Sequence, residues 1–165
     1  MDEIALNVVS IKVNGSIQTA AVESRQLLVH FLRGDCGLTG THIGCDTSYC
    51  GACTVHLDGE AVKSCNLFTV QADGREVKTV EGLETLQGLH ELQRSFSKYH
   101  ALQCGFCTPG MLMAALHLVT HKDKIGEADV RNALAGNVCR CTGYQNIVTA
   151  VLEAAKTLGN PNHEN

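Results

Sequence analysis

Apolar and polar positions alternate in the first half of the chain. Short apolar runs flank Asn14-Gly15, and a second pair of such runs flanks Asp58-Gly59. Asn-Gly and Asp-Gly between alternating runs are typical of two-residue hairpin turns, so two hairpins are predicted. Between them, Ser24 is expected to cap a helix from about Arg25 to Arg33, whose leucines recur at helical spacing.

Two more strand segments are predicted near Leu67–Gln71 and Val77–Val80. The order hairpin, helix, loop, hairpin and strand describes a small α+β unit, compatible with a sheet that grasps one helix. After about Val80 the apolar positions change to helical spacing. The fold class expected for the whole chain is therefore α+β, with the helices concentrated in the second half.

The second half contains signals for four helices. Thr108-Pro109 reads as a helix start, with Thr as the N-cap and Pro at the first helical position. The segment after it is apolar on several sides and is expected to be buried. Four short helices favour a compact bundle. They are predicted near residues 83–96, 109–121, 127–135 and 146–158.

Composition narrows the class of protein. The 165 residues leave room for one ordinary domain or two small ones, and 4% aromatic residues imply an aliphatic core. A formal net charge of −4 gives no case for nucleic acid or an anionic membrane as partner. The acidic start lacks a signal-peptide pattern and no apolar run could span a bilayer, so the cytoplasm is the expected compartment. Nine cysteines in that compartment indicate metal or redox chemistry.

Four cysteines in the first half have the spacing C-x4-C-x2-C-x11-C and are called the first thiol set: Cys45, Cys50, Cys53 and Cys65. The first three match the spacing of plant-type 2Fe-2S ferredoxins, in which four thiolates hold two irons. Glycines in the loop allow the backbone to approach an inorganic cluster. Zinc sites commonly use two C-x2-4-C pairs, which fits this loop poorly, and disulfides are disfavoured without a secretion signal.

Four more cysteines form the second thiol set: Cys104, Cys107, Cys139 and Cys141. They make a C-x2-C pair and a C-x-C pair, each ahead of a predicted helix, where the helix dipole stabilises thiolates. Zinc is an open alternative here, since C-x2-C with a second cysteine pair is also a zinc pattern. The ferredoxin-type loop in the same chain shifts the balance toward a second 2Fe-2S centre.

Three motifs carry a resemblance to a known family: HIGCDTSYCGAC, QCGFCTPGM and GNVCRCTGYQNI. In this order, over about Ile11 to Leu158, they resemble the iron–sulfur subunit or domain of the molybdenum hydroxylases, the xanthine oxidase family. Among separate subunits the wording is most similar to that of aerobic carbon monoxide dehydrogenase. Small subunits of related N-heterocycle or aldehyde dehydrogenases are the alternative within the family.

The resemblance implies two domains. Residues 1–80 would form a β-grasp ferredoxin-like domain, with the first thiol set holding a 2Fe-2S cluster toward FAD. Residues 81–165 would form a four-helix domain, with the second thiol set holding a 2Fe-2S cluster toward molybdopterin. Gln103 and Cys141 match the positions that contact the pterin cofactor of the partner subunit.

The function implied is electron relay from a molybdopterin centre to FAD. The molybdenum cofactor and FAD would lie on partner chains, a large and a medium subunit, in a dimer of heterotrimers. No G-x-G-x-x-G, P-loop or nucleophile–base constellation is present, so the chain is not expected to be catalytic alone. A zinc-stabilised interaction module without a redox role is the alternative from another class.

Two other features have simpler interpretations. Cys36 has no motif partner and is expected to act as a small buried hydrophobe. His117 and His121 are four residues apart on a predicted helix, a spacing that suits a metal, but no third ligand is evident. One packed and one exposed histidine is the favoured interpretation.

Overall fold

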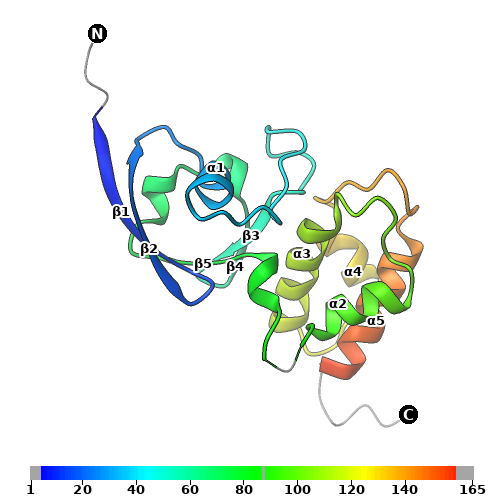
Figure 1. Ribbon diagram of the computed structural model, residues 1–165. Coiled ribbons are helices and arrows are strands. Elements are labelled where there is room, and N and C mark those ends of the chain that lie inside the picture. The colour runs from blue at the N-terminus through cyan, green and yellow to red at the C-terminus, as the bar shows by residue number, and fades with distance from the viewer. Residues whose placement is uncertain (1–4, 87, 159–165) are drawn as a thin grey trace.

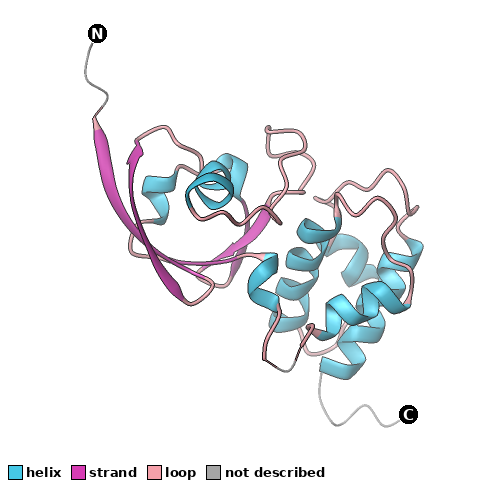
Figure 2. Ribbon diagram, viewed as in Figure 1, coloured by secondary structure: helices cyan, strands magenta, loops and turns pink. Residues whose placement is uncertain are grey.

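The computed structural model describes residues 5–86 and 88–158. A twisted sheet covered by short helices forms one part, and a cluster of four helices forms the other (Figures 1 and 2). The predicted α+β class is confirmed. Each part has its own buried cluster, one built around Ile11 and Phe31 and the other around Phe96, Met111 and Ile147.

The sheet has five strands in the order β2-β1-β5-β3-β4. β1 pairs parallel with β5, and the other neighbouring pairs are antiparallel. Alternate residues of β1 are buried, which is the period-two pattern of a sheet with one covered face. The strands are β1 Leu6–Val13, β2 Ser16–Glu23, β3 Thr54–Leu57, β4 Glu60–Lys63 and β5 Glu76–Lys78.

Both predicted hairpins are confirmed, and their turns have the expected backbone. Asn14 and Gly15 have φ of 48° and 84°, and Asp58 and Gly59 have φ of 51° and 90°. Two successive positive φ values define the turn whose twist matches that of paired strands. The tip of the first hairpin also contacts the connection to the helices, because the Asn14 amide exchanges two 2.9 Å hydrogen bonds with Thr79.

The helix predicted from Arg25 begins later. α1 spans Leu28–His30 and continues as a π-helical turn over Phe31–Asp35. Leu27 stays extended because it forms a β-bridge with Phe68, so helical geometry begins only after it. Ser24 is not the cap: its hydroxyl accepts a hydrogen bond from the side chain of Asn7 instead.

The strand predicted near Leu67–Gln71 is wrong. Only the isolated bridge at Phe68 is extended pairing, and a 3-10 turn, Thr69–Ala72, follows it. The second predicted strand is shifted, since β5 ends at Lys78 and a 3-10 turn, Val80–Leu83, leads to the helices. A short apolar run does not distinguish a strand from a 3-10 turn, because either can place its few apolar side chains in the core.

The four predicted helices are present: α2 Glu91–Lys98, α3 Thr108–His121, α4 Glu127–Ala133 and α5 Gln145–Leu158. The first begins later than expected because Leu86 and Leu89 are exposed and lie outside it. Its cap is His90, whose ring accepts the N–H of Leu92. Within the described residues, no helix has the length and apolar character needed to cross a bilayer.

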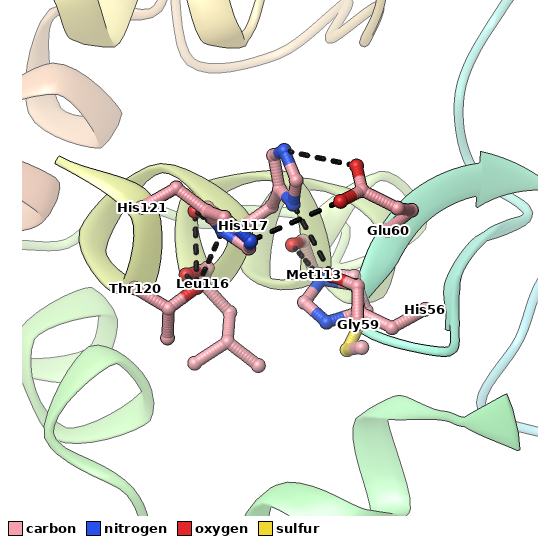
Figure 3. A network of polar contacts seen from close by, with 8 residues as sticks. All are labelled: His56, Gly59, Glu60, Met113, Leu116, His117, Thr120 and His121. Carbon is pink, nitrogen blue, oxygen red and sulfur yellow. Dashed lines mark hydrogen bonds and ion pairs between the residues drawn. The ribbon is translucent and has the colours of Figure 1, made fainter. Parts of the chain in front are cut away.

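The two parts meet where α3 packs against β3 and β4. His56, buried on β3, donates its Nε2–H to the carbonyl oxygen of Met113 at 2.8 Å. Figure 3 shows His117 and His121 of α3 facing the β3–β4 hairpin. The Nδ1–H of His117 donates to the Gly59 oxygen at 3.3 Å, and both rings lie about 4 Å from the Glu60 carboxylate. Polar contacts therefore join the sheet to the bundle.

Candidate metal centres

The loop between α1 and β3 wraps around the sulfur of Cys45. Three backbone N–H groups point at this sulfur, from Thr47, Tyr49 and Cys50, at 3.4, 3.3 and 3.2 Å. The loop reaches this shape through positive φ at Asp46 (55°) and Ser48 (64°). A ring of N–H donors around one sulfur stabilises negative charge there, as a thiolate ligand requires.

The other members of the first thiol set are arranged around the same loop. The sulfur of Cys65 accepts the N–H of Ser48 at 3.3 Å. Cys53 and Cys65 are buried together, next to Val29 of α1. The set therefore combines one sulfur ringed by donors with two sulfurs enclosed by the α+β core.

The pKa values of these thiols diverge with their surroundings. Hydrogen bonds lower the pKa of Cys45 to about 6: the side chain of Thr47 contributes most, followed by the backbone of Cys50 and Thr47. Burial raises the pKa of Cys53 to about 11, and the neighbouring Cys65 thiol adds to the rise. A bound cation offsets such a burial cost, because metals take cysteine as the thiolate.

The second thiol set comes from two connections in the helical part. Cys104 and Cys107 lie directly before α3, and Cys139 and Cys141 lie in the loop between α4 and α5. The Cys104 and Cys141 sulfurs are 3.5 Å apart. Unlike the first set, these sulfurs are brought together by the packing of helices rather than by one continuous loop.

Local contacts also shift the pKa values of the second thiol set. Burial raises the pKa of Cys107 to about 12, with the Cys139 thiol as the next cause. Burial opposes ionisation of Cys139 too, but the hydroxyl and N–H of Thr142 outweigh it and lower the pKa. The Thr142 hydroxyl is 3.1 Å from the Cys139 sulfur. The pKa of Cys141 is raised chiefly by its contact with Cys104.

The thiols of both sets associate in pairs. Cys45 lies with Cys50, Cys53 with Cys65, Cys104 with Cys141 and Cys107 with Cys139. A single zinc ion, with Zn–S bonds of about 2.3 Å, requires four sulfurs around one point. No group of three or more Cys, His, Asp or Glu side chains in the described residues is arranged in that way. Two pairs of thiols fit a centre with two irons, in which four cysteines are shared between the metals.

A cleft connects the two sets. It is lined by Gly44, Cys50 and Ala52 from the first loop and by all four cysteines of the second set. The hydroxyl of Thr108, next to Cys107, is buried and has no hydrogen-bond partner in the described part of the chain. An unpartnered donor beside a thiol pair suits a sulfur-rich group as acceptor, so the residues present fit a 2Fe-2S centre at this position.

Other residues join the two loops, and the sequence patterns did not indicate them. The N–H of Val138 donates to the Cys50 oxygen at 2.8 Å, and the buried amide of Asn137 donates to the Gly51 oxygen at 3.0 Å. Gly110 at the start of α3 lies so close that a Cβ there would be 2.1 Å from the Gly51 oxygen. The only available signal was their position near ligand cysteines, which does not reveal contacts between residues so far apart in the sequence.

Two family models match the chain. Residues 11–83 match a 2Fe-2S iron-sulfur cluster binding domain, and residues 79–152 match a [2Fe-2S] binding domain. The chain is 46% identical over 92% of its length, and 92% of the relative, to the caffeine dehydrogenase subunit gamma of a Pseudomonas species. It is also 48% identical to the nicotine 6-hydroxylase small subunit of Paenarthrobacter nicotinovorans, with 93% of each chain covered. The chain belongs to the iron–sulfur subunits of the molybdenum hydroxylases.

Solved structures agree with this assignment. Quinoline 2-oxidoreductase from Pseudomonas putida 86 matches with a TM-score of 0.90 and 42% identity, covering 93% of this chain and 96% of that chain. The aldehyde oxidoreductase from Desulfovibrio gigas matches with a TM-score of 0.87 and 39% identity, but this chain spans only 17% of it. The same unit is therefore found both as a separate subunit and as part of a longer chain.

Family membership supports the predicted function and cofactors. The chain is an electron-transfer subunit of an oxidoreductase complex, and its cofactors are two 2Fe-2S clusters. The homologues are subunits of multi-subunit complexes, so larger partner chains are implied. The narrower likeness to a carbon monoxide dehydrogenase stays a prediction.

The residues set aside in the sequence have ordinary structural environments. Cys36 is partly buried against the sheet core, and burial raises the pKa of its thiol to about 11, with Asp35 adding to the rise. A neutral thiol in this position packs as a small hydrophobe. His117 is half-buried against Gly59, and His121 is exposed.

Proposed function

We propose that each thiol set holds one 2Fe-2S cluster and that the chain relays electrons between two other subunits. The first cluster is held by Cys45, Cys50, Cys53 and Cys65, and the second by Cys104, Cys107, Cys139 and Cys141. The pairing of the thiols, two by two in each set, is the observation that carries this proposal. A bound 2Fe-2S cluster accepts and donates one electron at a time.

The chain's own residues do three things in this function. The N–H groups of the first loop stabilise charge on the Cys45 sulfur, and the Thr142 hydroxyl does so on Cys139. The burial of Cys53 and Cys65 excludes water from one side of the first set. The hydrogen bond from Val138 to Cys50 brings the two ligand loops into direct contact. These contacts fix positions and tune reduction potentials.

The exposed end of the second set supports a proposal for the partners. Cys104, Gln103 and Cys141 are exposed, beside the exposed apolar side chains of Phe106 and Val138. We propose that this face meets a large molybdopterin-binding subunit, with Gln103 and Cys141 toward the pterin, and that the first set lies toward FAD on a medium subunit. A dimer of heterotrimers in the cytoplasm, where thiols stay reduced, completes this proposal.

The proposed domain division is residues 1–80 and 81–165. It is supported by the two separate buried clusters and by family models that overlap only at residues 79–83. For the substrate of the complex, the names of relatives favour an N-heterocycle, since caffeine, nicotine and quinoline all contain ring nitrogen. The substrate pocket itself belongs to a partner chain.

The test is the iron, zinc and acid-labile sulfide content of the anaerobically purified chain, with EPR of the dithionite-reduced protein. About four iron and four sulfide with two distinct signals are expected for two clusters. About two iron with one zinc would contradict the proposal for the second set and favour a structural zinc site there. A colourless protein that contains zinc and no iron would favour the interaction-module alternative.

A further inference from the structure

The two ligand loops meet at one buried polar contact. Asn137 is 6% exposed, and its side-chain N–H group donates to the Gly51 oxygen at 3.0 Å. The same group lies 3.5 Å from the Thr54 hydroxyl, which itself donates to the Gly51 oxygen at 2.7 Å. A buried amide with such partners holds one geometry, because breaking its bond would leave the buried N–H group of Asn137 without a good acceptor.

The backbone around this contact leaves no free space. Gly51 has φ of 75°, and a Cβ there would lie 2.4 Å from the Gly136 oxygen and 2.7 Å from the Asn137 amide. Such distances are far inside van der Waals contact. The segment of residues 136–138 is therefore pressed directly against the loop that carries the first thiol set.

Asn137 directly precedes Val138, whose backbone hydrogen bond connects the two ligand loops. Val138 follows it and donates its N–H to the oxygen of Cys50, and Val138 is itself followed by Cys139. A short bonded path thus runs from the Cys50 sulfur through its carbonyl and this hydrogen bond to the Cys139 sulfur. Electronic coupling falls off more slowly along bonds and hydrogen bonds than across empty space.

We infer that Asn137 is a positioning residue that sets the coupling between the two metal centres. This inference rests on the proposed function, since it takes Cys50 and Cys139 as ligands. The amide of Asn137 fixes Gly51, and so fixes the Cys50 carbonyl opposite the Val138 N–H. One electron passes between the centres at a time, and no bond forms or breaks in that step.

The experiment measures the magnetic interaction between the two reduced centres. It appears as a splitting of their signals in low-temperature EPR of the fully reduced chain. Asn137→Asp keeps the side-chain shape but removes the donor and turns an oxygen toward the Gly51 carbonyl. Asn137→Ala removes the contact altogether. Both variants are expected to keep the iron content of the wild type and the g-values of both signals, with a narrowed or lost splitting.

Lys63→Met is the matched control. Lys63 donates to the Gly136 oxygen at 2.6 Å from the solvent side, so the variant removes a donor to the same segment without touching Gly51. Its splitting is expected to equal that of the wild type. Equal narrowing in this control would overturn the assignment to Asn137, and so would an unchanged splitting in both Asn137 variants.

The outcomes separate this inference from the proposed function. A wild-type chain without two distinct reduced signals would contradict the proposed function itself. If the wild type gives two signals and their splitting is the same in the Asn137 variants, only the inference is contradicted. A lower thermal midpoint in the Asn137 variants with unchanged splitting would show a purely structural role and would also overturn it.

Discussion

The two thiol sets reach a similar arrangement by different means. The first set is formed mainly by one loop, whose own N–H groups surround Cys45. Two of its cysteines, Cys53 and Cys65, are buried next to Val29 of α1. The second set is assembled from the ends of helices, and two of its four thiols are exposed. The first centre therefore depends on local backbone geometry, and the second depends on helix packing.

The largest effect expected from this comparison is a selective loss of one centre. Cys141→Ser should remove the second centre and leave the first, because the first set takes none of its ligands from the helical part. Iron should fall from about four to about two per chain, with one EPR signal left. Cys36→Ser is the control and should leave iron unchanged. Loss of both signals in Cys141→Ser would mean that the two sets do not assemble independently.

The next effect tests the close packing between the loops that carry the two sets. Gly51→Ala should destabilise the chain by several kcal/mol and disturb both EPR signals, because its Cβ would collide with the Gly136 oxygen. Gly74→Ala is matched in backbone, with φ of 72°, but its Cβ would meet open space. That control should cost only about 1 kcal/mol, measured by denaturant unfolding. Equal costs for the two variants would remove the steric argument.

A smaller effect concerns the contact between sheet and bundle at acid pH. Burial holds the pKa of His56 below its ordinary value, with nearby His117 and Lys78 also lowering it. The unfolded chain then binds a proton more readily, so stability is complete above the unfolded value of about 6.5 and is lost as pH falls below it.

The measurement is the denaturant midpoint of the wild type and of His56→Asn between pH 8 and pH 5. The wild type should lose more stability on acidification than the variant, which has no group to titrate at this position. His30→Asn, at an exposed histidine, should behave like the wild type. A variant that keeps the full pH dependence of the wild type would assign the acid sensitivity to other groups.

The smallest effect concerns the reduction potential of the second centre alone. Thr142→Val removes the hydroxyl beside the Cys139 sulfur, so the reduced state loses one hydrogen bond. The potential of the second centre should fall by roughly 20–60 mV, the equivalent of one modest hydrogen bond. The first centre should not change, and Thr149→Val, at a hydroxyl bonded only within α5, should change neither. Redox titration followed by EPR makes the measurement.

Much of the fold could be predicted because its signals are local. The turns at Asn14-Gly15 and Asp58-Gly59 have the positive φ values that their residues favour. Thr108-Pro109 does begin a helix, although Cys107 occupies the cap position. The late start of α1 could not be predicted, because it depends on a bridge between Leu27 and Phe68, forty-one residues apart.

The candidate site divides in the same way. Cysteine spacing predicts both sets, since cysteines close in sequence are also close in space. The contacts that join the sets come from Asn137, Val138 and Gly110, which have no special pattern of their own. Their role depends on how the helical part docks on the loop, and that docking is a tertiary property.

The contacts of the two hairpin tips also determine where extra sequence can be inserted into this protein. Exposed tips are usually the positions that accept inserted sequence. Here Asn14 binds Thr79 in the connection that leads to the helices, and Gly59 accepts a hydrogen bond from His117 of α3, so each tip holds a contact with another part of the chain. The N–H of Gly74 donates to the Ser10 oxygen of β1 instead, within the sheet part, and a Cβ at Gly74 would meet open space. A reporter tag inserted at Gly74 would leave both of these contacts intact, whereas a tag inserted in either hairpin tip would break one of them.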